Sequence, residues 1–208
     1  SSFSSLISLD GLSGLKSIGR DFEINVSSAY ALDKLSSFEG LGSLETIGRD
    51  FRIISSAANK LSSFSGLSGL KSIGRDFEIN VSGSFSLDKL SSFEGLGSLE
   101  TIGGNFRIIS TSSSSFGPLS SLSSFRGLSG LKSIGGDFEI NSLASSSAGC
   151  SAYSLNKLSS FVGLESLETI GGNFKIISSS SSSSSSLGDN AGSLSSLSSF
   201  RGLSGLKS

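Results

Sequence analysis

The chain has 208 residues and a formal net charge of −1, with one Cys, one Pro and no His, Met or Trp. A nearly neutral chain gives no electrostatic basis for a polyanionic partner, and no basic patch with interleaved aromatic residues is present, so we expect no nucleic acid partner. No apolar run approaches the roughly 20 residues that cross a bilayer, so we also expect no membrane span.

Catalytic chemistry has little support in the composition. Without His, the commonest general base and metal ligand is missing, and one Cys cannot build a thiolate metal site or an internal disulfide. The sequence contains no G-x-S-x-G nucleophile turn, no GxxxxGK[ST] phosphate loop and no GxGxxG fingerprint. We therefore predict no enzymatic activity, no metal site and no cofactor.

One 19-residue phrase, seen in Leu35–Ile53 as LSSFEGLGSLETIGRDFRI, organises the chain from its beginning. No copy has an insertion or deletion inside the phrase, whereas the segments between copies vary from 7 to 20 residues. A constant core with variable connections is typical of a solenoid, in which each phrase forms one coil and the connections leave at one corner. The complete copies are Leu6–Ile24, Leu35–Ile53, Leu61–Ile79, Leu90–Ile108, Leu122–Ile140 and Leu158–Ile176, and the phrase restarts at Leu197.

The apolar spacing inside the phrase favours extended segments over helix. Apolar residues recur every three positions, which does not fit the 3.6-residue period of a helix, and the final F-x-I alternates as a strand does. We expect three short extended segments per coil, with turns at glycines such as Gly40 and Gly48, which require a positive φ or a close approach between coils. The predicted fold is all-β: a single-stranded β-solenoid of about six complete coils plus a partial seventh, with a 19-residue core per coil, forming one domain over residues 1–208.

Two outward columns of the expected solenoid alternate in charge from coil to coil. Because stacked strands lie roughly 4.8 Å apart, each basic residue is expected to lie between acidic residues of the neighbouring coils, which fixes the register of stacking. The first column is Lys16, Glu45, Lys71, Glu100, Lys132, Glu168 and Lys207, and the second is Glu23, Arg52, Glu78, Arg107, Glu139 and Lys175.

The connections contain two N-glycosylation sequons. Asn25-Val-Ser and Asn80-Val-Ser both follow the F-x-I segment at the same exit, two coils apart. Asparagine in N-x-S/T is the acceptor for N-linked glycans in secreted proteins, so Asn25 and Asn80 are candidate glycosylation sites. The serine runs are candidate carriers of O-linked glycans on composition alone.

A few large side chains in the connections are candidates for contacts with other molecules. Repeat proteins commonly bind through the face that carries their loops. The candidate contact residues are Tyr30, Phe85, Phe116 and Tyr153, together with Cys150, which is either a free thiol or one half of an intermolecular disulfide.

The repeat LSSFRGLSGLKSIGGDFEI resembles the leucine-rich β-helix repeat of receptor L domains, and is similar to repeats of fungal GPI-anchored cell-wall proteins. The resemblance is carried by the L-x-x-L-x-x-I-G-G core that ends at Gly136 and by the F-x-I strand at Phe138–Ile140. It implies an extracellular or cell-surface protein, often glycosylated, that faces a ligand or a matrix. Receptor L domains are usually joined to Cys-rich modules, which this chain lacks, and no binding residue of that family can be placed on it.

Two functions remain open from the sequence. The first is a non-enzymatic structural role, as an extracellular subunit of a surface filament, sheath or matrix that binds copies of itself. The phrase is interrupted in its seventh copy, so we expect the chain to belong to a longer chain or an assembly, because uncapped solenoid ends expose unpaired strands. The alternative is an L-domain-like ectodomain module that binds a protein or a glycan through its Ser-rich loop face.

Overall fold

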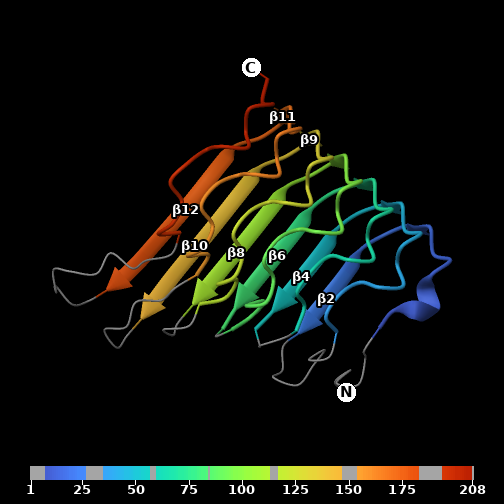
Figure 1. The fold of residues 1–208 in the computed structure, drawn as a ribbon, viewed down its shortest axis with the longest axis horizontal. Helices are drawn as coiled ribbons and strands as arrows, with labels where there is room; N and C mark the ends of the chain where they lie inside the picture. The colour runs from blue at the N-terminus through green and yellow to red at the C-terminus, as the bar shows by residue number, and fades with distance from the viewer. Residues whose placement is uncertain are drawn as a thin grey trace.

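A computed structural model describes residues 8–26, 35–56, 60–83, 85–112, 117–146, 154–182 and 194–207. Within these ranges the chain winds as a β-solenoid, which confirms the predicted fold class. The long strands lie side by side in one row, with β2 and β12 at its opposite ends (Figure 1). One short 3-10 helix, η1 (Asp10–Leu12), lies in the first coil.

Each complete coil contributes one short and one long strand to two parallel six-stranded sheets. The short strands, in sheet order, are β1 (Ser17–Ile18), β3 (Thr46–Ile47), β5 (Ser72–Ile73), β7 (Thr101–Ile102), β9 (Ser133–Ile134) and β11 (Thr169–Ile170). The long strands are β2 (Phe22–Val26), β4 (Phe51–Ser55), β6 (Phe77–Ser82), β8 (Phe106–Ser112), β10 (Phe138–Ser146) and β12 (Phe174–Ser182). Because these strands all point the same way, their carboxyl ends lie along one edge, where the connections leave the coils (Figure 1).

The third side of each coil differs from the expectation of a third strand-like segment. Its residues, such as Leu61–Phe64, are bonded to the neighbouring coils but form no strand: Ser62 N–H donates to the Ser36 carbonyl at 2.9 Å. A turn follows at once, because Leu67 N–H donates back to the Phe64 carbonyl at 3.0 Å. The turn diverts the backbone before a continuous ladder can form, so two strands per coil carry the sheets.

Glycine is required where the coils approach each other most closely. Gly66 has φ +96°, and a Cβ there would overlap the Phe38 carbonyl of the preceding coil. An L-residue side chain is therefore excluded at this turn both by its backbone conformation and by lack of space. At Gly74 the constraint is space alone, because a Cβ would overlap the Gly48 carbonyl.

Two ladders of phenylalanine rings run along the interior. Rings of the long strands stack at centroid distances of 5.1–5.2 Å, and rings of the third side stack at 5.5–5.7 Å. The two ladders also contact each other with steeply inclined rings, as Phe93 does with Phe106 at 5.9 Å and 55°. Such aromatic pairs add about 0.5–1.5 kcal/mol each to the burial of their area. The core is thus continuous from coil to coil.

A further ladder of leucines closes the core where the connections re-enter the coils. Leu87, Leu119, Leu155 and Leu194 have φ between 51° and 58°, and they are between 0% and 8% exposed. Each accepts a backbone hydrogen bond from the first leucine of the following phrase, as Leu119 does from Leu122 at 3.2 Å. A left-handed backbone costs an L-residue roughly 1–2 kcal/mol, which burial of a leucine side chain offsets. The ordered core of these coils therefore begins three residues before the 19-residue phrase.

Candidate functional site

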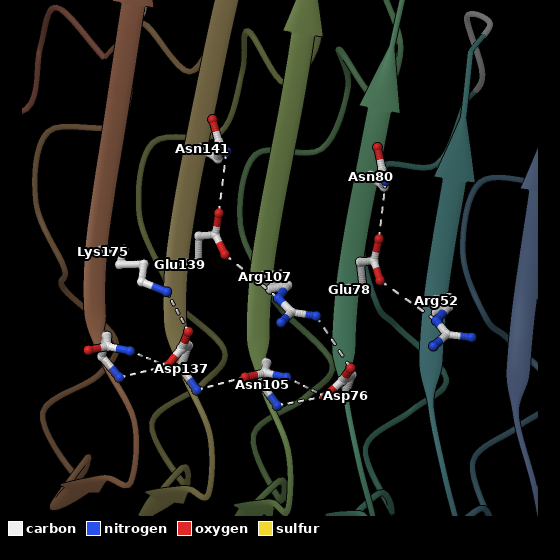
Figure 2. Close-up of polar contacts among 11 residues, drawn as sticks. Arg52, Asp76, Glu78, Asn80, Asn105, Arg107, Asp137, Glu139, Asn141 and Lys175 are labelled. Carbon is white, nitrogen blue, oxygen red and sulfur yellow. Dashed lines mark hydrogen bonds and ion pairs between the residues drawn. The ribbon is translucent and has the colours of Figure 1, made fainter.

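A row of Asp and Asn side chains runs along the axis at the turn before each long strand (Figure 2). From the second coil on, the backbone N–H of this residue donates to the side-chain oxygen of its counterpart in the preceding coil, as Asp76 does to Asp50 at 3.0 Å and Asn105 to Asp76 at 2.8 Å. The turn leaves this N–H without a carbonyl partner, and the side chain supplies the acceptor that a backbone donor needs. The row is Asp21, Asp50, Asp76, Asn105, Asp137 and Asn173.

The asparagines of this row bind the neighbouring carboxylates through their amides as well. The Nδ2 of Asn105 donates to the Oδ1 of Asp76 at 2.9 Å, and the Nδ2 of Asn173 donates to the Oδ1 of Asp137 at 3.0 Å. Each of these carboxylates therefore accepts two hydrogen bonds at one oxygen from the next coil. The row was not anticipated from the sequence, although Asp or Asn precedes the Phe of F-x-I in every copy.

Basic side chains contact the second oxygen of the same carboxylates. Arg107 Nη1 lies 3.5 Å from Asp76 Oδ2, and Lys175 Nζ lies 2.6 Å from Asp137 Oδ2. The backbone N–H of Asn173 and the Lys175 ammonium together lower the pKa of Asp137 from 3.8 to about 2. Hydrogen bonding to the charged form and a nearby cation both favour ionisation, so Asp137 stays ionised at pH values where an ordinary aspartate takes up a proton.

The outward columns form ion pairs between adjacent coils. In the first column Lys71 Nζ lies 2.7 Å from Glu45 Oε2, and Lys132 Nζ lies 2.8 Å from Glu100 Oε2. Lys71 lowers the pKa of Glu45, first through its hydrogen bond and then through its charge. Glu168 pairs with Lys207 in the same way.

In the second column Arg52 pairs with Glu78, and Arg107 with Glu139, each at 3.7 Å (Figure 2). The register of the long sheet places Arg52 between Glu23 and Glu78. The basic residue therefore does lie between two acidic ones of the column, but within the column Arg52 forms an ion pair with Glu78 only, and its other ion pair is with Asp50 of its own coil.

The asparagines at the two sequons lie on the outer face of the long sheet and bind the glutamates of the second column. Asn80 Nδ2 donates to Glu78 Oε1 at 3.1 Å, and Asn25 Nδ2 donates to Glu23 Oε1 at 3.4 Å. Asn141 does the same to Glu139 at 3.3 Å. Asn25 is exposed and Asn80 is half-buried, and glycosylation of either remains a prediction.

Among the proposed contact residues, only Phe85 falls within the described ranges. Its side chain is 42% exposed, and its φ is 61°. Tyr30, Phe116, Cys150 and Tyr153 lie outside the described residues.

A column of inward-facing residues on the long sheet contains both valine and serine. Val81 on β6 lies in register between Ser55 on β4 and Ser110 on β8. Ser110 pairs in turn with Ser142 on β10, and all four side chains are buried. The hydroxyls of Ser110 and Ser142 have no hydrogen-bond partner in the described structure. A buried hydroxyl without a partner destabilises the fold relative to an apolar group of similar shape.

Within the described residues, no cluster of three or more His, Cys, Asp or Glu side chains has an arrangement that would hold a metal ion. No helix in the same part of the chain is long and apolar enough to cross a bilayer. Comparison with family models, with curated proteins and with solved structures found no match for this chain. The functional argument therefore rests on the geometry of the solenoid.

Proposed function

We propose that this protein is a non-enzymatic structural rod, an extracellular subunit of a surface filament, sheath or matrix. The observation that carries the proposal is the constant register of the long sheet, in which Phe stacks on Phe and Ile on Ile at every junction from β2 to β12. The polar groups on its outer face bind one another: Asn80 donates a hydrogen bond to Glu78, and Glu78 forms an ion pair with Arg52. A surface whose charges neutralise each other along the axis suits a scaffold.

Electron microscopy of native material, in low and in high salt, tests this role. Filaments with an axial repeat near a multiple of the roughly 4.8 Å strand spacing are the expected result. The matched pair of variants is Gly66→Val, which blocks stacking at the Phe38 carbonyl, and Gly97→Ala, where a Cβ would meet open space. Gly66→Val should abolish the filaments and Gly97→Ala should retain them. Dispersed short particles in both salts would reject the filament role.

The alternative function, binding of a protein or glycan at the loop corner, is favoured by two exposed apolar side chains. Phe85 presents a large apolar side chain at that corner, and Leu143 on β10 is 38% exposed. Glycan-array and cell-binding screens with the parent chain and with Phe85→Ser distinguish the two roles. Selective binding that is lost in Phe85→Ser would support a binding module, whereas no selective binding by either protein supports the rod.

Glycosylation at Asn25 and Asn80 would support the extracellular location. The chain has an internal control, because Asn141 occupies the same column but is followed two residues later by Leu143 in place of Ser. Mass spectrometry of native material should find glycan at Asn25, Asn80 or both, and none at Asn141. Unmodified peptides at both sequons would remove this support.

A further inference from the structure

The junctions between successive coils are of two chemical kinds. The first to sixth coils carry β2, β4, β6, β8, β10 and β12, and residues 197–207 begin the seventh coil. Between the second and third coils, the outward columns supply the pairs Glu45–Lys71 and Arg52–Glu78. The equivalent columns join the fourth coil to the fifth through Glu100–Lys132 and Arg107–Glu139. The sixth coil is joined to the seventh through Glu168–Lys207.

At the intervening junctions the short ion pairs between coils are made to the Asp/Asn row, whose backbone hydrogen bonds are present at every junction from the first coil to the sixth. Arg107 of the fourth coil contacts Asp76 of the third at 3.5 Å, and Asn105 adds an amide hydrogen bond to the same carboxylate. Lys175 of the sixth coil contacts Asp137 of the fifth at 2.6 Å. Arg49 of the second coil contacts Asp21 of the first at 3.7 Å. The ion pairs that join the coils therefore alternate between column carboxylates and row carboxylates, although the backbone repeats every coil.

Shape alone does not prevent a coil from stacking on the wrong neighbour. The Phe, Leu and Ile positions and the turn glycines recur in every copy, so the second coil would fit on the fourth as well as on the third. The outward columns do distinguish these neighbours. Stacking the second coil on the fourth would place Glu45 beside Glu100, and like charges opposite each other on neighbouring strands are destabilising.

We infer that the alternating columns are a register code, by which a coil accepts neighbours of the opposite charge class and rejects those of its own class. The code disfavours skipping one coil during folding and permits skipping two. It is a property of coil-on-coil recognition and holds for this chain whether the rod serves in a filament or as a binding module.

Two deletions of the full chain test the code. Removing residues 61–89 takes out the third coil with the connection that follows it, and places Glu45 against Glu100. Removing residues 61–121 takes out the third and fourth coils, and places Glu45 against Lys132. Both deletions retain the same seven-residue connection, 54–60, before the new junction.

The decisive measurement is the effect of Glu45→Lys on the unfolding midpoint in each background, followed by circular dichroism at low salt. In the parent chain and in the two-coil deletion the substitution places like charges together, so Tm should fall by about 1–4 °C. In the one-coil deletion it replaces the repulsion between Glu45 and Glu100 with a lysine–glutamate attraction, which offsets the new repulsion from Lys16. The Tm shift in that background should therefore be more positive than in the other two. The contact with Lys16 changes equally in all three backgrounds, so the difference between them isolates the new junction.

The difference between the backgrounds decides the inference. A fall in Tm with Glu45→Lys in the one-coil deletion as large as the fall in the two-coil deletion would overturn the code. If the one-coil deletion does not fold, its Glu45→Lys variant should fold under the same conditions, and failure of that variant beside a folded two-coil deletion would also overturn it. In about 1 M salt, where the Debye length is about 3 Å, the three shifts should shrink toward zero.

Discussion

The turn before the long strand is built differently in the first three coils and in the last three. In the first three, an Arg precedes an Asp, as in Arg75-Asp76. In the last three, a Gly precedes an Asn or Asp, as in Gly104-Asn105. Both versions supply an acceptor oxygen to the backbone N–H of the next coil. The two versions differ in how the negative charge of the stacked carboxylates is compensated.

In the first half, carboxylates stack on carboxylates in three successive coils. Such groups, roughly 4.8 Å apart, repel one another, and guanidinium groups lie close by to oppose this. Asp50 is 3% exposed, and its Oδ2 lies 2.7 Å from Arg52 Nη2. In the second half, acid alternates with amide, and the asparagine donates to the carboxylate directly. The fold therefore requires a hydrogen-bond acceptor at this position. It tolerates compensation of the carboxylate charge either by a nearby guanidinium group or by an asparagine amide.

The glycine that precedes the Asn or Asp in the last three coils gives the largest expected difference between the two halves. A Cβ at Gly104 would overlap the Asp76 carboxylate and lie 2.8 Å from the Arg75 carbonyl carbon, so Gly104→Ala should lower the free energy of unfolding by about 1–3 kcal/mol. Gly97→Ala is the control, because a Cβ there meets open space. Urea denaturation of the two variants measures the difference, and equal stabilities would show that the turn has room for a side chain in this half.

Converting the second half to the charge pattern of the first should also destabilise the rod. Asn105→Asp would create an unbroken run of five carboxylates and remove the amide hydrogen bond to Asp76. We expect a loss of about 1–2 kcal/mol at pH 7. The loss should diminish below about pH 4, as carboxylates in the run take up protons. Denaturation at pH 7 and at pH 4 checks this, and a loss that does not depend on pH would contradict the role of repulsion.

A substitution in the inward-facing column should raise the stability of the fold, whereas the two preceding substitutions should lower it. Ser110→Val would give β8 the residue that Val81 supplies on β6, and would remove an unpartnered hydroxyl, so stability should rise by about 1 kcal/mol. The matched control is Ser86→Val, because Ser86 Oγ donates to the Ser82 carbonyl at 2.9 Å, and losing that bond should destabilise. Both are measured by thermal unfolding. A destabilised Ser110→Val would mean that the hydroxyl has a partner in solution.

The smallest expected effect is on acid stability. The pKa of Asp137 is lowered to about 2 in the fold, so its stabilising contribution is complete above the unfolded value of about 3.9 and is lost as pH falls from about 4 to about 2. Asp137→Asn should flatten this part of the stability curve. Free energies of unfolding at several pH values between 2 and 6 test the prediction, and parallel curves for parent and variant would refute it.

The sequence predicted the features that depend on period and failed for those that depend on local geometry. The 19-residue repeat and the F-x-I alternation were sufficient for the solenoid and for the place of its long strands, because stacking in register follows from identical coils. The Asp/Asn row was missed because Asp and Asn serve equally as acceptors, so the row has no alternation of charge to reveal it. The shared signal was a side-chain acceptor before Phe in every copy.

Two other features could not be read from residue type. The buried leucine ladder adopts a left-handed backbone, as at Leu119, although leucine has no preference for it. The third side of the coil forms no strand because the turn after Phe64 interrupts it, and the regular apolar spacing conceals that turn.

The hydrogen bonds that join one coil to the next run along the axis of the rod, and this has a mechanical consequence. A pull along that axis loads the junctions in series, so the tensile strength equals that of the weakest junction and adding coils does not raise it. When a junction fails, its coil peels away and releases roughly 60 Å of extended chain from the 19-residue phrase, which absorbs work before the next junction bears the load. Under tension such a rod would therefore unfold in steps, one coil at a time, and dissipate work at each step.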